Sequence, residues 1–252
     1  GTCMITAASN SRIKRLVQLN QKSKLRRTED VFLAEGVKMF LEAPREQLQE
    51  VYVSESFLEK CSCREHLEEV GYEVVSDSVF SKISDTCTPQ GVLCVLKQFH
   101  YNIEEMLRDK APLFLLLENI QDPGNLGTML RTGEGAGVSG IIMSRDTVDL
   151  YNPKVIRSTM GSIYRVPFYY AADFAAVHQV QQAGVSVYAA HLRGKNSYAC
   201  QDYTKGTAFL IGNEGNGLRE ETAELADCYI RIPMEGKVES LNAAVASSIL
   251  MY

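Results

Sequence analysis

The sequence predicts an α/β protein that is divided into two domains. Apolar runs of strand length alternate with segments of helical periodicity, which is the pattern of sheets covered by helices. The run at 113–117 is apolar at every position, as in a strand buried on both faces of a parallel sheet. A length of 252 residues allows roughly one to two domains. We therefore predict a first domain at 1–98, a linker at 99–112 and a second domain at 113–252.

The first domain is predicted to be a small α/β/α unit. Its strands are expected at 31–36, 50–53, 72–76 and 91–96. Its helices are expected at 4–27, 37–43, 56–71 and 79–83. Pro44 stops the second of these helices and Gly71 closes the third, as these residue types do at helix ends.

The second domain repeats a strand–helix order. Strands are expected at 113–117, 140–144, 165–168, 185–190, 207–212 and 228–232. Helices are expected at 125–136, 153–160, 174–183 and 219–225, with a final one from residue 239. This order predicts one parallel sheet with helices on both faces. The chain reaches Tyr252 inside the last helix, so the position of the natural C-terminus stays open.

The composition is that of an ordinary globular protein, with 45% hydrophobic and 23% charged residues. No apolar run approaches the roughly 18–20 residues that span a bilayer, and the first residues show neither the n-region nor the h-region of a signal peptide, so we expect no signal peptide. We therefore expect a cytoplasmic protein with no membrane partner. The seven cysteines form no C-x-x-C pair and the four histidines show no ligand spacing, so we predict no metal.

A basic segment stands out near the N-terminus, although the net charge is −5. It contains seven cations and no acid, namely Arg12, Lys14, Arg15, Lys22, Lys24, Arg26 and Arg27. A local basic stripe on an acidic protein is typical of a surface that binds nucleic-acid phosphates. The alternative is a solvated helix face, because lysine and arginine are common surface residues.

Residues 135–140 match the letters of the dinucleotide motif G-x-G-x-x-G. That motif requires a strand before it and a helix after it. Here the predicted order is helix, then strand, so we interpret the segment as a helix end and a tight turn. A nicotinamide-dependent dehydrogenase is therefore disfavoured.

The first candidate site segment, which we call the first motif, covers residues 118–131. It begins at the carboxyl end of a predicted central strand, where ligands bind in open α/β sheets. Asn125 is expected to cap the helix that follows, and Gly127 permits close approach of another backbone. Arg131 offers a planar fork that suits phosphate. The alternative is a cap, a packing glycine and a surface arginine.

The second motif covers residues 209–218 and places three glycines after an apolar strand. Such a loop brings its main chain close to a partner. Glu214 is either a dipole partner for the next helix or a carboxylate of the site. The third motif covers residues 230–252, and Ser240 and Asn242 stand in it where a loop becomes a helix. We expect the three motifs to form one site.

Together the motifs resemble the SpoU/TrmH family of RNA ribose methyltransferases, within the SPOUT superfamily. The resemblance rests on Asn125-Leu126-Gly127 with Arg131, on Gly212-Asn213-Glu214-Gly215 with Gly217-Leu218, and on Ile232-Pro233-Met234, Gly236 and Ser240-Leu241-Asn242. It covers residues 113–252. Residues 4–97 are more loosely similar to the N-terminal substrate-binding domain of this family, which resembles ribosomal RNA-binding proteins.

The resemblance implies a deep trefoil knot from about Phe209 onward, S-adenosylmethionine as cofactor, and a homodimer whose subunits share the site. Cofactor contacts would come from Gly212, Asn213, Gly217, Ile232, Met234 and Leu241. Catalytic or substrate contacts would come from Asn125, Arg131, Glu214, Ser240 and Asn242. The seven cations of the basic segment would bind RNA.

The implied reaction is methyl transfer to a ribose 2′-hydroxyl of RNA. Ribosomal RNA is favoured as substrate because a separate RNA-binding domain suits a structured target. A transfer RNA 2′-O-methyltransferase, a base methyltransferase and a non-catalytic ribosome-assembly factor of the same fold stay open. The base is also open: a guanidinium resists deprotonation, so Glu214 or an RNA phosphate is an alternative to Arg131. The target nucleotide and any antibiotic-resistance role cannot be inferred from the sequence, and DNA is not expected as a partner.

Overall fold

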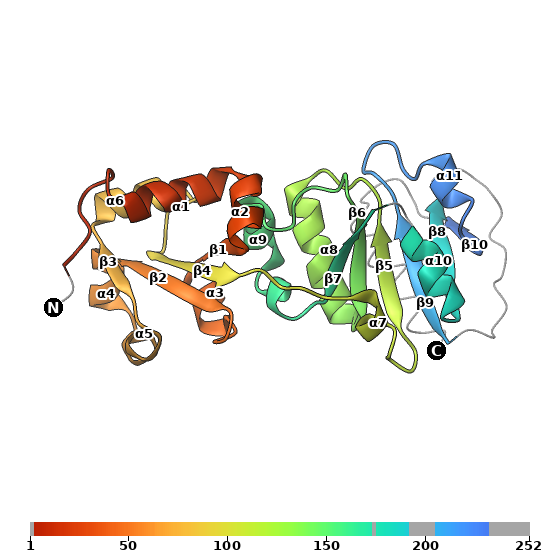
Figure 1. Cartoon of the computed structure of the whole chain (residues 1–252), viewed down its shortest axis with the longest axis horizontal. Coiled ribbons are helices and arrows are strands. Elements are labelled where there is room, and N and C mark those ends of the chain that lie inside the picture. The colour runs from red at the N-terminus through yellow and green to blue at the C-terminus, as the bar shows by residue number, and fades with distance from the viewer. Residues whose placement is uncertain (1–2, 173–174, 192–204, 232–252) are drawn as a thin grey trace. The chain divides into compact units, whose positions relative to one another are not determined.

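The computed structural model describes residues 3–172, 175–191 and 205–231 (Figure 1). The chain forms two compact units. One unit combines the described residues of Gly1–Phe99 with Asp149–Tyr164. The other combines those of His100–Val148 and Arg165–Tyr252.

The first unit contains a four-stranded sheet in the order β1-β4-β2-β3. Its strands are β1 (Val31–Glu35), β2 (Leu48–Ser54), β3 (Glu73–Val75) and β4 (Val92–Lys97). The β1–β4 and β4–β2 pairs are antiparallel, whereas β2 and β3 are parallel. All four strands overlap the predicted ones, because each is an apolar, β-branched run bounded by turn residues.

Helices lie on both faces of this sheet, with α1 and α6 on one side and α3 to α5 on the other (Figure 1). The helices before the linker are α1 (Ser11–Gln21), α2 (Ser23–Glu29), α3 (Val37–Glu42), α4 (Glu55–Lys60), α5 (Arg64–Val70) and α6 (Asp77–Ile83). The single helix predicted at 4–27 is therefore wrong. Lys22 has extended backbone angles that interrupt it and separate α1 from α2.

The segment Asp149–Tyr164 belongs to the first unit, although it connects two strands of the second. It contains α9 (Pro153–Thr159) and the 3₁₀ turn η1 (Ser162–Tyr164). The Arg26 guanidinium pairs with the Asp149 carboxylate at 2.9 Å, and the buried Tyr164 hydroxyl donates to the Met39 carbonyl at 2.8 Å. These contacts attach the segment to the first unit.

The predicted boundaries at residues 98 and 113 placed all of 149–164 in the C-terminal domain. The structure differs because the side chains of this segment find their partners around β1 rather than around the strands on either side of it. The order of the predicted elements along the chain does not indicate that this segment packs against the first unit. The predicted linker also contributes to a core, since α7 (Ile103–Met106) buries Ile103 and Met106 in the second unit.

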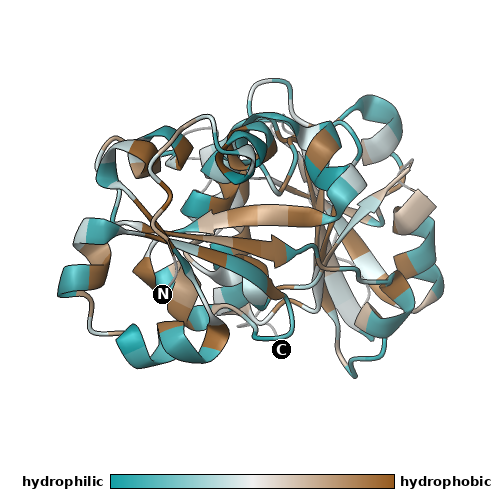
Figure 2. Ribbon diagram, turned by 60° about the vertical axis from the view of Figure 1, so that its left-hand side comes forward, coloured by the Kyte–Doolittle hydropathy of each residue, from teal (hydrophilic) through white to brown (hydrophobic). Residues whose placement is uncertain are grey.

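The second unit contains a parallel six-stranded sheet in the order β10-β8-β9-β5-β6-β7. Its strands are β5 (Leu113–Leu117), β6 (Gly140–Ser144), β7 (Phe168–Ala171), β8 (Val185–His191), β9 (Gly206–Ile211) and β10 (Cys228–Arg231). The central strand β5 is buried at four of its five positions, as predicted for a strand covered on both faces. Figure 2 shows apolar residues concentrated on such strands.

The helices of the second unit are α7, α8 (Pro123–Ala136), α10 (Ala175–Gln182) and α11 (Glu220–Ala223) among the described residues. The crossover through α8 runs from β5 to β6, and the crossover through α10 runs across the sheet in the opposite direction, from β7 to β8. Right-handed crossovers therefore place α8 and α10 on opposite faces. Gly137, in the left-handed conformation, ends α8 before β6, which confirms our interpretation of residues 135–140.

Within the described part of the chain, no helix combines the length and the apolar character needed to cross a bilayer. The same residues contain no group of three or more histidine, cysteine or acidic side chains arranged to hold a metal ion. The expected absence of a metal stays a prediction, because part of the chain lies outside these ranges.

Candidate functional site

The first and second motifs meet at the carboxyl edge of the parallel sheet. Strands β5 and β9 are adjacent and parallel, with Leu117 opposite Ile211, so both chains leave the sheet at the same edge. The Asn213 side-chain amide donates to the Asn119 carbonyl at 2.8 Å. The expected convergence of these two motifs is therefore seen, and an asparagine of one motif fastens the other.

Glu214 makes the second connection between the two motifs. Its carboxylate accepts hydrogen bonds from the backbone N–H groups of Gln121 at 3.0 Å and Asp122 at 3.3 Å. Both groups lie immediately before α8. Glu214 therefore faces the start of α8. The sequence predicts either a dipole partner for the next helix along the chain or a carboxylate of the site, and Glu214 does not face that next helix. A carboxylate at this end of a helix is also favoured by the helix dipole.

The second motif closes on itself through backbone groups. Asn213 and Gly217 exchange two backbone hydrogen bonds, of 3.1 and 2.9 Å, and the Asn213 side-chain oxygen accepts from the N–H groups of Gly215 and Asn216. A Cβ atom placed on Gly212 would lie 2.2 Å from the Gly217 carbonyl carbon. The end of β9 is therefore lined by main chain, and only glycine fits at residue 212.

The helix α8 is capped by Asp122 rather than by Asn125, which corrects our expectation. The Asp122 carboxylate accepts the Asn125 backbone N–H at 2.8 Å, and Pro123 occupies the first helical position, where proline is well tolerated. Asn125 is thus the third residue of the helix. Its side-chain amide is not used by the cap.

Arg131 lies further along α8 and is exposed. It has no hydrogen bond or ion pair with a described residue. At 3.6 residues per turn, six residues separate Arg131 from Asn125 by about 120° around the helix axis. The two side chains therefore leave the helix in different directions.

Asn119 has an unusual backbone conformation at the point where β5 ends. Its φ angle is 53°, in the left-handed region that residues other than glycine seldom adopt. Its N–H donates to the Ser144 hydroxyl at 2.8 Å, and its carbonyl accepts from Asn213. Backbone conformations of this kind cluster at functional sites when the surroundings hold them.

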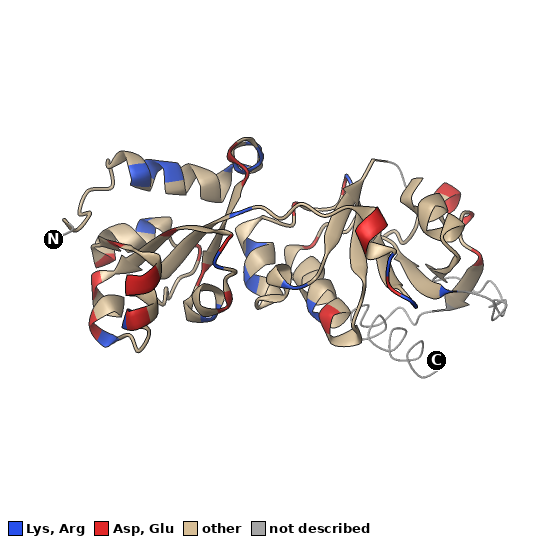
Figure 3. Ribbon diagram, turned by 60° about the horizontal axis from the view of Figure 1, so that its bottom comes forward, with Lys and Arg blue, Asp and Glu red and all other residues tan. Residues whose placement is uncertain are grey.

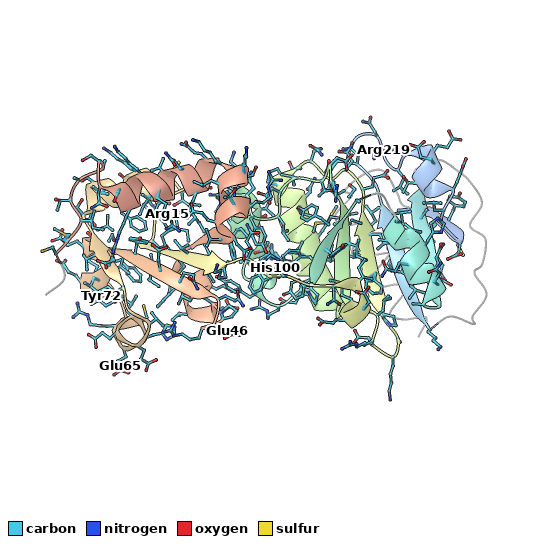
Figure 4. All side chains as sticks on the ribbon, viewed as in Figure 1. Arg15, Glu46, Glu65, Tyr72, His100 and Arg219 are labelled. Carbon is cyan, nitrogen blue, oxygen red and sulfur yellow. The ribbon has the colours of Figure 1, made fainter. Side chains whose placement is uncertain are left out.

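The sequence analysis missed a charged network beside the two motifs. Glu118 is only 1% exposed, and its carboxylate accepts from the Arg219 backbone N–H at 2.7 Å and from the Thr222 hydroxyl. The Arg219 guanidinium, labelled in Figure 4, pairs with Asp146. A glutamate directly after an apolar run was the available signal, because a buried carboxylate needs partners.

The pKa of Asp146 lies below its usual value. Partial burial would raise this pKa, but the hydrogen bond from the Ser144 hydroxyl and the charge and hydrogen bond of Arg219 outweigh it. Arg219 shows the matching change, because Asp146 raises the pKa of its guanidinium. The carboxyl edge of the sheet therefore holds Asp146 ionised at neutral pH.

Four of the seven predicted RNA-binding cations are exposed and make no ion pair with a described residue. They are Lys14, Lys22, Lys24 and Arg27. Figure 3 shows basic residues on the two N-terminal helices. Arg12 and Arg15 are instead engaged in ion pairs, Arg12 with Glu73 at 3.0 Å and Arg15 with two carboxylates at 2.8 Å.

Arg26 does not face solvent, contrary to the prediction. It is 3% exposed, and its guanidinium donates to the Leu19 and Asn20 carbonyls as well as to Asp149. The physical reason is the break at Lys22, which turns α2 so that this side chain points into the unit. Arg26 holds the end of α1 and the segment Asp149–Tyr164 together.

Five predicted site residues lie outside the described ranges, namely Ile232, Met234, Ser240, Leu241 and Asn242. Of the third motif, the structure describes only Ile230 and Arg231, within β10. The predicted convergence of this motif with the other two therefore stays a prediction.

An open parallel sheet whose motifs join at its carboxyl edge defines a ligand-binding protein of the α/β class. Comparison with known proteins identifies the family. The model of the SpoU rRNA Methylase family matches residues 112–252, and that of the MRM3-like substrate binding domain matches residues 10–94. The chain belongs to the SpoU rRNA methylase family.

Individual relatives match nearly the whole chain. The 23S rRNA (guanosine(2553)-2′-O)-methyltransferase RlmP of Bacillus subtilis is 33% identical over 251 residues, which cover 98% of this chain and 97% of the relative. The 23S rRNA (guanosine-2′-O-)-methyltransferase RlmB of Bordetella pertussis is 32% identical and covers 82% of this chain and 88% of its own. A crystal structure of an AdoMet-bound rRNA methyltransferase from Sinorhizobium meliloti has a TM-score of 0.80 and 29% identity, with 98% of this chain and 95% of that chain covered.

Proposed function

We propose that this protein is an S-adenosylmethionine-dependent methyltransferase that modifies a ribose 2′-hydroxyl of RNA, with ribosomal RNA as substrate. The observation that carries the proposal is the junction of the first and second motifs through Glu214 and Asn213, in a chain of the SpoU family. The two curated relatives named above methylate ribose in 23S rRNA according to their names. The N-terminal match to a substrate-binding domain supports a structured RNA target.

S-adenosylmethionine would be held by Gly212, Asn213 and Gly217 together with Ile232, Met234 and Leu241. The described part of this set is compatible with such a ligand, because two of its three residues are glycines and the nearest neighbours of Gly212 are main-chain atoms of Gly217 and Leu218, so this turn presents mainly backbone groups. The Sinorhizobium structure, which is named as AdoMet-bound, supports the same cofactor. When bound, the cofactor supplies an electrophilic methyl group on a sulfonium ion.

The catalytic contributions of this chain are mainly positional. We assign Arg131 to an RNA phosphate beside the target ribose, because its guanidinium resists deprotonation and has no partner among the described residues. Glu214 positions the two motifs and is not the base, since its carboxylate already accepts two backbone N–H groups. Asn125, Ser240 and Asn242 would orient the ribose hydroxyl, and a phosphate oxygen of the RNA would accept its proton.

We further propose a homodimer with a site shared between subunits. Asn125 and Arg131 lie about 120° apart around the axis of α8. This separation supports a shared site, because one subunit can supply the amide and its partner the guanidinium. The family resemblance supports a trefoil knot in the part of the chain from Phe209 onward. RNA rather than DNA is the proposed partner because only RNA carries the 2′-hydroxyl acceptor. The proposed location is the cytoplasm, without a membrane partner.

The test is transfer of labelled methyl groups from S-adenosylmethionine into ribosomal RNA and transfer RNA, each offered separately. Nucleoside analysis then separates ribose from base methylation. We expect ribose methylation of ribosomal RNA, with a loss of at least about 100-fold for Arg131→Ala and Asn242→Ala. Arg108→Ala, an exposed arginine of the same unit, is the matched control.

Three results would contradict the proposal in different ways. Incorporation only into transfer RNA would replace the substrate, and methylated bases would replace the acceptor atom. Absence of both cofactor binding by calorimetry and methyl incorporation would favour an assembly factor without enzymatic activity. Full activity of Arg131→Ala and Asn242→Ala would remove these two residues from the site.

A further inference from the structure

A cavity of about 540 Å³ opens at the carboxyl edge of the parallel sheet, which we call the edge cavity. Residues that line it include Arg145, Asp146, Ala175, His178, Arg219 and Glu221. Arg145 and Asp146 follow β6, Ala175 and His178 lie on the first turn of α10, and Arg219 and Glu221 lie at the start of α11. Figure 1 shows α10 and α11 beside this part of the sheet. The volume falls within the roughly 300–1,000 Å³ of small-molecule sites.

The edge cavity is separate from the predicted cofactor contacts. None of the described cofactor positions, Gly212, Asn213 and Gly217, lines it. Glu118 lines the edge cavity and its carboxylate accepts from the Arg219 backbone N–H, while the carbonyl of the next residue, Asn119, accepts from Asn213. A ligand in the edge cavity therefore lies beside the junction of the two motifs, with its own set of side chains.

The charges of the edge cavity exclude a small free polyanion. Arg219 is already matched by Asp146, and its guanidinium lies 4.0 Å from Glu118. Glu221 adds a further exposed carboxylate. A free phosphate or sulfate would thus face carboxylates on several sides, and like charges at short range repel it.

A nucleotide, in contrast, combines one anionic group with a neutral base. Arg145 is exposed and has no ion pair with a described residue, so it is available to a phosphate. The Glu221 carboxylate accepts hydrogen bonds from amino or imino groups of a base edge, and the exposed His178 ring offers a stacking surface. Ala172 and Ala175 leave the space that a base requires.

We infer that the edge cavity binds one unpaired nucleotide of the substrate RNA, other than the nucleotide that is methylated. Its phosphate contacts Arg145, and its base lies between His178 and the Glu221 carboxylate. This inference rests on the proposed RNA substrate. It explains how the enzyme selects one site in a long RNA: a nucleotide that is splayed out of its stack is recognised beside the reacting ribose.

Two variants test the inference without changing the proposed catalytic residues. Ala175→Phe fills the cavity, and Gln182→Phe places the same side chain at an exposed position of α10 outside it. Arg145→Gln removes the free cation, and Arg108→Gln makes the same change elsewhere in the unit. Thermal unfolding of each variant shows whether it is folded. The readouts are RNA affinity by fluorescence anisotropy, KM for RNA, kcat, and S-adenosylmethionine affinity by calorimetry.

We expect Ala175→Phe to weaken RNA binding and raise KM for RNA about tenfold, the effect of losing one stacked base, with cofactor affinity unchanged. Arg145→Gln should weaken RNA binding and lower the slope of log affinity against log salt by about one. Wild-type RNA affinity in both variants would overturn the inference. Loss of cofactor binding in Ala175→Phe would also overturn it, because the cavity would then belong to the cofactor.

The proposed function fails separately from this inference. If the wild-type protein binds RNA but transfers no methyl group, the enzymatic proposal falls, and the anisotropy measurements still decide what occupies the edge cavity. If the wild-type protein transfers methyl groups and the cavity variants bind RNA with wild-type affinity, the enzymatic proposal stands and the proposed nucleotide site is contradicted.

Discussion

The Glu214 carboxylate accepts the backbone N–H of Gln121 at 3.0 Å, across 93 residues of sequence. The contact joins the turn after β9 to the turn after β5, at the edge of the sheet where the site is proposed. A charged acceptor strengthens such a hydrogen bond relative to a neutral one. Glu214 therefore stabilises the arrangement of the two turns. We expect its replacement to weaken cofactor binding rather than to lower kcat.

Glu214→Gln keeps an acceptor atom and removes the charge. Because hydrogen bonds to charged groups contribute about 1.5–3 kcal/mol and this one is partly exposed, we expect a loss of roughly 1 kcal/mol, or about a fivefold weaker cofactor affinity. Calorimetry with S-adenosylmethionine measures this change, with Glu224→Gln as an exposed acidic control. If Glu214 were the general base, kcat would instead fall by about 10² or more at an unchanged affinity.

Gly212→Ala should disrupt the second motif. The added Cβ would lie 2.2 Å from backbone atoms of Gly217 and Leu218, which cannot turn away as a flexible side chain can. We expect a loss of about 2 kcal/mol in unfolding free energy, as in other overpacked sites, together with loss of cofactor binding. Urea denaturation and calorimetry measure both.

The matched control for this substitution lies in the same turn. A Cβ on Gly215 would meet only the Asn213 side-chain oxygen at 3.5 Å, which is ordinary contact. Gly215→Ala should therefore change stability by no more than about 0.5 kcal/mol. Equal effects of the two alanine variants would show that the close approach at Gly212 is not what the turn requires.

Arg26→Gln and Lys24→Gln should separate folding from RNA binding. Arg26 is buried, and its replacement removes the hydrogen bonds that it donates to Asp149 and to two carbonyls, so we expect a destabilisation of about 2–3 kcal/mol. Lys24 is exposed, so its variant should keep its stability and reduce the salt dependence of RNA binding. Denaturation curves and anisotropy titrations at several salt concentrations distinguish the two. A stable Arg26→Gln variant with weakened RNA binding would restore the original prediction.

Tyr52 should make the first unit sensitive to alkaline pH. Burial raises the pKa of its phenol, and the hydrogen bond to the Glu50 carboxylate raises it further. The folded state thus favours the neutral phenol, and its stabilising effect is fully present below the ordinary tyrosine pKa of about 10. As pH rises above this value the unfolded chain ionises first, so stability falls.

The measurement is the midpoint of urea denaturation between pH 8 and pH 11. The difference between wild type and Tyr52→Phe should change with pH only above about pH 10, because phenylalanine has no proton to lose. Tyr72→Phe, which lies one residue before β3, serves as the tyrosine control. A pH-independent difference for Tyr52→Phe would contradict the assignment.

Most of the secondary structure could be predicted because it depends on local pattern. The run Leu113–Leu117 is apolar throughout and became the buried β5, and Gly137 ended α8 as a glycine at a helix end does. The break at Lys22 could not be predicted, because none of Gln21, Lys22 and Ser23 is a glycine or a proline, the residue types that strongly interrupt a helix. It reflects tertiary packing, which places Arg26 inside the unit.

The positions of the loops that form the candidate site could be predicted from the sequence, but the hydrogen-bond partners of their residues could not. Glycines after an apolar strand indicated the turn at 212–218, but the choice of Asp122 over Asn125 as helix cap depends on which residue adopts extended angles. The partners of Glu118 lie 101 and 104 residues away, at Arg219 and Thr222, so no local pattern points to them. Long-range partners of this kind require the fold.

The return of Asp149–Tyr164 to the first unit limits how the protein can be recombined. The chain passes from one unit to the other after Phe99, after Val148 and after Tyr164. Neither unit is therefore formed by a single continuous stretch of the sequence. A fragment that stops at Phe99 leaves the Phe32 ring without Tyr151, whose ring centroid lies 4.8 Å from it. A chimaera that borrows another RNA-gripping module must therefore exchange a stretch from the middle of the gene along with its beginning.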